Sequence, residues 1–120
     1  MLALKDYQSR ALRALERFLH ASRMQPAADA FAAELNRQDA PQPREYQSTF
    51  DDVPAVCLRI PTGGGKTLLA AHAVGMAGRA VLDTDAPIAL WLTPSDAIRS
   101  QTLAALSNVR HPYRQALAEA

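Results

Sequence analysis

A glycine-rich turn constrains the fold of this chain more than any other feature. Residues 61–67 read Pro-Thr-Gly-Gly-Gly-Lys-Thr and come directly after an apolar run at residues 56–60. Because three consecutive glycines carry no Cβ, successive backbone N–H groups can point inward at phosphate oxygens. A helix that begins near Lys66 would add the positive end of its dipole to the same anion. The sequence therefore predicts a buried strand, a turn that cradles a polyphosphate, and a helix.

The residues that end the turn carry the chemistry of this predicted site. Lys66 is placed to reach the terminal phosphates as a point charge, and the Thr67 hydroxyl is placed to ligate the accompanying magnesium ion. The strict form of such a loop begins with glycine, whereas this chain has Ile60. A glycine-rich turn with a chance Lys-Thr is the plain alternative, but the flanking strand and helix favour a nucleotide site. We therefore expect ATP and Mg²⁺ as cofactors, with Lys66 and Thr67 as catalytic candidates and Thr67 as the metal ligand. The candidate cofactor-binding residues in the turn are Pro61, Thr62, Gly63, Gly64, Gly65, Lys66 and Thr67.

The chain before the turn divides into two parts. Residues 1–23 contain an amphipathic pattern that predicts a helix over 6–23, with Asp6 as its N-cap and arginines on the polar face. Those arginines could face DNA, but Glu16 lies among them, which favours an ordinary solvated face. Residues 24–52 are polar, rich in alanine and interrupted by prolines, so they predict an insertion or linker with a short helical stretch.

The chain from residue 53 to residue 120 has the pattern of alternating strands and helices. A nearly continuous apolar run is typical of a strand that is covered on both faces in a parallel sheet. Strand, helix, strand and helix in this order predict an α/β fold with a parallel sheet and right-handed crossovers. The tail from residue 108 is polar and is expected to fray. The expected elements are a strand over 56–60, a helix from Lys66 to about residue 77, a strand over 88–93 and a helix from residue 95 or 96 to about residue 106.

The composition limits the classes of partner and compartment. The net charge of +1 gives no overall field that would attract DNA or an anionic membrane, so any nucleic-acid contact must come from local groups. The single cysteine, Cys57, excludes a disulfide framework and is interpreted as a small core hydrophobe in the first strand. No signal-peptide pattern and no run of membrane-spanning length occur, so we expect a cytoplasmic protein without a membrane partner.

Two segments of the chain resemble motifs of one family of motors. The turn at residues 61–67 resembles motif I of superfamily-two helicases of the DEAD/DEAH type, and more narrowly that of the motor (Res) subunits of type III restriction enzymes. Residues 4–8, Leu-Lys-Asp-Tyr-Gln, are similar to the Leu-x-x-Tyr-Gln entry of the family. The resemblance implies that Gln8 reads the adenine ring. It also implies a RecA-like P-loop NTPase domain, incomplete in this chain, that follows an N-terminal helix and a proline-containing insertion.

A third segment is similar to motif Ia, which touches the nucleic-acid backbone. Residues 90–95 read Leu-Trp-Leu-Thr-Pro-Ser, and Gln-Thr follows at 101–102. If both predicted strands lie in one parallel sheet, their carboxyl ends meet at the same edge, and this turn lies beside the phosphate loop. A serine hydroxyl and the N–H groups of a helix start can hold a DNA phosphate. A strand–Pro–helix turn with a capping serine is the structural alternative. The candidate nucleic-acid-binding residues are Pro94, Ser95 and Arg99.

An acidic residue that completes the metal site is missing from the pattern. The acids after the turn are Asp83, Asp85, Asp96 and Glu119, and none of them ends an apolar strand. Phosphoryl transfer needs groups that order the attacking water and stabilise the developing charge. We therefore expect residues 1–120 alone not to hydrolyse ATP.

These observations predict the N-terminal part of an ATP-dependent DNA helicase or translocase. The resemblance implies a methyltransferase or specificity subunit as a partner and a connection to restriction endonuclease activity. A stand-alone module that binds a nucleotide without hydrolysis is the alternative. A small-molecule P-loop kinase fits less well, because such kinases usually satisfy the strict glycine pattern.

Overall fold

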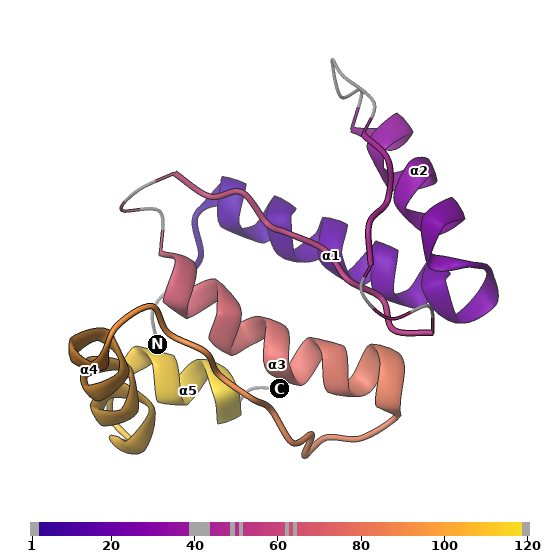
Figure 1. Ribbon diagram of the computed structural model, residues 1–120. Coiled ribbons are helices and arrows are strands. Elements are labelled where there is room, and N and C mark those ends of the chain that lie inside the picture. Colours follow the sequence, from indigo (N-terminus) through magenta and orange to yellow (C-terminus); the bar gives the residue numbers. More distant parts are fainter. Residues whose placement is uncertain are drawn as a thin grey trace.

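The computed structural model describes residues 3–38, 44–48, 50, 52–61, 63 and 65–118, and helices dominate this part of the chain (Figure 1). Helix α3 lies in the middle, with α1 against one side and α5 against another. Helix α2 packs on α1, and α4 contacts α5. The helices are α1 (Asp6–Met24), α2 (Ala27–Arg37), α3 (Lys66–Leu82), α4 (Asp96–Ser107) and α5 (Pro112–Ala118).

Helix α1 confirms the amphipathic prediction, but its first residue is not the cap. Lys5 occupies the N-cap position, and its backbone N–H donates to Oε1 of Gln8 at 2.9 Å. Asp6 lies in the first turn, where a carboxylate interacts favourably with the helix dipole. The apolar side of the helix buries Leu12, Leu15, Phe18 and Leu19.

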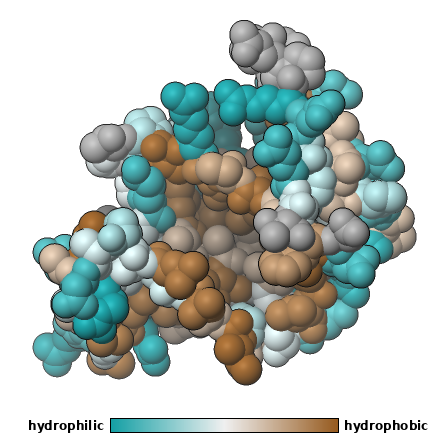
Figure 2. All heavy atoms as spheres, viewed as in Figure 1, coloured by the Kyte–Doolittle hydropathy of each residue, from teal (hydrophilic) through white to brown (hydrophobic). Residues whose placement is uncertain are grey.

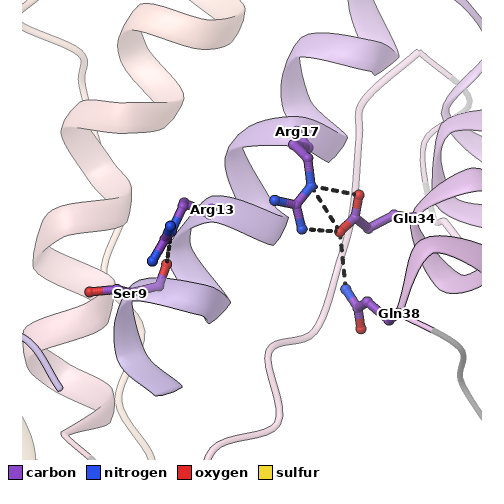
Figure 3. A network of polar contacts seen from close by, with 5 residues as sticks. All are labelled: Ser9, Arg13, Arg17, Glu34 and Gln38. Atoms are coloured by element: carbon purple, nitrogen blue, oxygen red, sulfur yellow. Dashed lines mark hydrogen bonds and ion pairs between the residues drawn. The ribbon is translucent and has the colours of Figure 1, made fainter. Parts of the chain in front are cut away.

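One hydrophobic core joins α1, α2 and α3. Phe18 is only 2% exposed, and its ring lies 6.4 Å from that of Phe31, edge to face. An ion pair closes the outer side of the α1–α2 contact, where the Arg17 guanidinium reaches a Glu34 carboxylate oxygen at 2.7 Å (Figure 3). Gln38 donates to the same carboxylate at 3.2 Å. Part of the insertion predicted from the sequence is therefore a packed helix.

A second core joins α3, α5 and the segment that precedes α4. Leu68, Ala71 and Ala116 are buried there, and Trp91 and Tyr113 pack against them. Trp91, in the apolar run at 88–93, is thus a packing residue of this core. The prediction that the chain frays from residue 108 is wrong, because Pro112–Ala118 forms α5 and Ala116 is 2% exposed.

Helix α3 is longer than the sequence predicted. It was expected to end near Gly78, but it continues to Leu82, and Asp83 follows in the left-handed conformation with φ of 52°. Gly78 is needed for space instead. A Cβ at this position would lie 2.7 Å from Cγ of Pro87, so the glycine lets the following segment cross close to the helix.

The predicted parallel α/β sheet is wrong for the described residues, which contain no β-strand. Segments 54–61 and 87–93 are non-helical and flank a groove of about 480 Å³ over α3. Strands of one sheet pair along their edges at a spacing of about 4.8 Å. These two segments instead pack on different hydrophobic cores, because Leu58 contacts the first core and Trp91 contacts the second. The sheet therefore does not form, and Cys57, predicted to be buried in it, is exposed.

Candidate functional site

The glycine-rich turn has the backbone conformation that its composition suggests. Gly63 and Gly65 have φ values of 78° and 82°, in the left-handed region that favours glycine. Thr62 and Gly64, two of the candidate binding residues, lie outside the described residues. Pro61 is exposed at the end of the preceding segment. The turn thus reaches the start of α3 through backbone angles that other residues adopt at a cost.

The start of α3 presents its polar groups without a side-chain cap. Gly65 is the N-cap residue, and as a glycine it has no side chain that could cap the first turn. Lys66 is exposed, and within the described part of the chain no carboxylate forms an ion pair with it. Thr67 is half-buried in the same turn. An uncapped helix start beside an unpaired lysine is a favourable environment for an anion.

The structure brings Gln8 to the turn, although the two are far apart in sequence. A Cβ built on Gly65 would lie 2.5 Å from Nε2 of Gln8. Gln8 is 6% exposed, and its Oε1 accepts from the backbone of Lys5. The packing of α1 on α3 produces this approach. The insertion at 24–52 therefore does not separate the two motifs in space.

The second predicted turn has the geometry of a helix cap. Ser95 is the N-cap of α4, and its Oγ accepts from the N–H of Ile98 at 3.2 Å. The Thr93 hydroxyl donates to the carbonyl of Ser95 at 3.3 Å. Pro94 is exposed, and Arg99, another candidate, pairs with Asp96 at 2.8 Å. The serine hydroxyl thus caps its own helix, and the arginine is engaged at the surface.

The two turns lie toward the same end of α3. Both extended segments run back along the helix toward its N-terminus, so their last residues lie on the side where α3 begins (Figure 1). Trp91 packs against the cluster that contains Leu68, in the first turn of α3, whereas Pro87 lies beside Gly78 near the other end. The two turns thus lie toward one end of α3 although the described residues contain no sheet.

The acids that follow the glycine-rich turn lie at the far end of α3, are paired, or fall outside the described residues. Asp83 follows the last residue of α3, and a helix of 17 residues is about 25 Å long. Its carboxylate pairs with Arg23 at 2.8 Å, and the hydrogen bond from this arginine lowers the pKa of Asp83. Asp85 is exposed in the connector at that same end. Asp96 pairs with Arg99, and Glu119 lies outside the described residues. Among the described residues, no group of three or more histidine, cysteine or acidic side chains is placed to hold a metal ion.

The sequence reasoning missed the contact between Gln8 and Gly65. It assigned both residues to a nucleotide site separately, one by a glycine pattern and one by a resemblance. The helical spacing of apolar residues along α1 already indicated that Gln8 and Leu12 share the buried side of this helix. The pattern does not say which element that is.

A loop of left-handed glycines that leads into a helix starting with Lys-Thr is the arrangement found in P-loop nucleotide-binding proteins. Residues 1–119 match the family described as type III restriction enzyme, res subunit, and the chain belongs to this family. It is a family of helicase-like, ATP-dependent motors. No curated protein and no solved structure matches the chain significantly. No described helix is long and apolar enough to cross a membrane.

Proposed function

We propose that this chain is the nucleotide-binding part of an ATP-dependent DNA helicase or translocase of the type III restriction family. The observation that carries the proposal is the turn at Gly63 and Gly65, which leads into the start of α3 and its exposed Lys66. In this proposal Lys66 contacts the terminal phosphates of ATP, and the Thr67 hydroxyl ligates Mg²⁺. A cytoplasmic location belongs to the same proposal.

The proposal also assigns the second turn to DNA. Ser95 and the first N–H groups of α4 would hold a phosphate, with Pro94 shaping the turn and Arg99 adding charge if its pair with Asp96 opens. Such a contact is independent of sequence, as a translocating motor requires. By family resemblance, a methyltransferase or specificity subunit would be the protein partner.

Titration of a fluorescent ATP analogue in the presence of Mg²⁺ tests the nucleotide site. Lys66→Ala should abolish binding, because the phosphates lose the one long cation that starts α3. Arg79→Ala is the matched control, since Arg79 is an exposed cation in the last turn of the same helix and should bind normally. Equal affinity of the wild type and Lys66→Ala would overturn the proposal.

A measurement of ATP hydrolysis distinguishes a nucleotide-binding part of a motor from a complete ATPase. We expect phosphate release by residues 1–120 to stay at background with or without DNA, because none of the acids that follow the turn ends an apolar strand, where it could order the attacking water. A rate above background that is lost in Lys66→Ala would contradict this. The alternative, a stand-alone nucleotide-binding module, predicts a monodisperse monomer that melts cooperatively.

A further inference from the structure

The two left-handed glycines of the turn differ in what surrounds them. A Cβ at Gly63 would meet no atom within 4 Å, so only the backbone angle requires glycine there. A Cβ at Gly65 would lie 2.5 Å from Nε2 and 3.7 Å from Cδ of Gln8. Residue 65 is therefore restricted twice, by its φ of 82° and by the carboxamide that lies against it.

The carboxamide of Gln8 is held in place from its own side. Its Oε1 accepts the backbone N–H of Lys5 at 2.9 Å, which closes the first turn of α1, and the residue is 6% exposed. The packing of α1 on α3 fixes the distance between this turn and Gly65. On the other side, the carbonyl of Gly65 accepts from Leu69 at 3.0 Å and so begins the hydrogen bonds of α3.

We propose that Gln8 is a positioning residue for the phosphate loop, which it holds through Gly65. The buried carboxamide packs on the Cα of Gly65 and keeps this residue in the conformation that directs the first N–H groups of α3 toward the phosphates. This inference rests on the proposed nucleotide site, and it differs from a role in reading the base. A base reader discriminates between nucleobases, whereas a positioning residue affects every ligand that binds through its phosphates.

Affinities for three ligands, ATP, GTP and inorganic tripolyphosphate, separate the two roles. Gln8→Ala should weaken all three by the same factor, about tenfold, a typical coupling between contacting residues. Gln8→Met keeps the length of the side chain but loses the hydrogen bond from Lys5, so it should weaken all three by one common factor that is smaller than that of Gln8→Ala. A loss confined to ATP would overturn the inference and assign Gln8 to the adenine.

A double-mutant cycle tests the contact itself, with Gly63 as the matched position. Gly63→Ala and Gly65→Ala introduce the same backbone strain, but only the second places a methyl group against Gln8. Gly65→Ala should therefore weaken tripolyphosphate binding about tenfold more than Gly63→Ala. In the Gln8→Ala background the two substitutions should become equivalent, because the obstructing carboxamide is gone. Equal effects in the wild-type background would contradict the inference.

The outcomes distinguish this inference from the proposed function. If Lys66→Ala still binds the ATP analogue, the nucleotide site itself is wrong. If Lys66→Ala abolishes binding while Gln8→Ala leaves tripolyphosphate affinity unchanged, the site stands and the positioning role is wrong. Circular dichroism of each variant verifies folding, and Gln8→Met provides the folded comparison if Gln8→Ala unfolds.

Discussion

Two regions of the molecule are both rich in apolar residues but differ in how deeply these residues are buried. One is the contact between α1 and α3, and the other consists of the two extended segments beside α3. Phe18 in α1 and Leu69 in α3 are each only 2% exposed. In the segment before α4, Ile88 is 101% and Leu90 85% exposed. On the face drawn in Figure 2, hydrophobic residues gather in and around a central hollow. The helices complete their own backbone hydrogen bonds and need only a packing partner, whereas an extended segment also needs a neighbouring strand.

The groove between the extended segments shows what this difference leaves uncovered. It is lined on both sides by apolar residues, and its floor is formed by small residues of α3. Exposed apolar segments with unpaired edges favour association with other chains. The lining residues that the extended parts contribute are Val53, Pro54, Pro87, Ile88, Ala89 and Leu90.

The largest difference in stability should appear when one leucine in each region is replaced by alanine. Leu69→Ala removes a fully buried side chain of α3 and should cost about 2–5 kcal/mol of unfolding free energy. Leu90→Ala makes the same chemical change at a position that is 85% exposed and should stay within about 0.5 kcal/mol. Urea unfolding followed by circular dichroism measures both. Similar losses would mean that segment 87–93 is buried in solution.

A substitution at Gly78 tests how firmly segment 87–93 is docked on α3. Alanine is favoured over glycine in a helix by about 1 kcal/mol, but its Cβ would lie 2.7 Å from Pro87 and 3.0 Å from the carbonyl of Thr84. Overpacking of this kind typically costs about 1–3 kcal/mol, so Gly78→Ala should be a net destabilisation. In a Pro87→Ala background the cost should fall. A stabilised Gly78→Ala would show that the segment does not rest on the helix.

The ion pair between α1 and α2 should give a pH-dependent contribution to stability. Burial raises the pKa of Glu34, but hydrogen bonds from Arg17 and Gln38 lower it more, so the net pKa is below its ordinary value. The stabilisation is then present above the ordinary pKa of about 4.3 and is lost as the pH falls through the folded value. Arg17→Ala should lower the urea midpoint at pH 7, and the difference from the wild type should shrink at acidic pH. Arg10→Ala, which removes an exposed arginine from the same helix, is the control and should show no such convergence.

A charge on the exposed segment 87–93 should have the smallest effect on stability but a clear effect on self-association of the chain. Leu90→Lys places a charge on the exposed segment and should change the unfolding free energy by no more than about 0.5 kcal/mol. Sedimentation velocity should show less self-association than in the wild type. Ala97→Lys adds the same charge on the exposed surface of α4 and should leave association unchanged. Equal self-association of the wild type and Leu90→Lys would show that the chains do not associate through this segment.

Part of the fold follows from local patterns alone. Helix α1 has apolar residues at helical spacing, and α4 has Ser95 at its start, so both were predicted close to their observed bounds. Capping and helical periodicity involve neighbours within a turn or two, which are present in the sequence window itself. The left-handed glycines of the turn at 61–67 belong to the same class, since glycine is the residue that adopts such angles at no steric cost.

The prediction of two strands was wrong because a strand forms only when its backbone pairs with a neighbouring strand. The apolar runs at 56–60 and 88–93 have the composition of buried strands, yet each packs one side on a separate helical core. The exposed Cys57 and Leu90 follow from the same cause. Helix α5 was missed for the opposite reason, because its seven residues depend on burial of Ala116 against α3.

The sequence by itself determined the glycine-rich loop, its Lys-Thr ending and the helix that follows it, because these depend on backbone preferences and on local spacing. Only the tertiary structure decided which residue meets the loop. Gln8 lies against Gly65 because α1 packs along α3, and this contact joins residues that no local pattern relates. The same packing left the extended segments on opposite sides of a groove, since pairing between strands is a long-range choice that their composition does not specify.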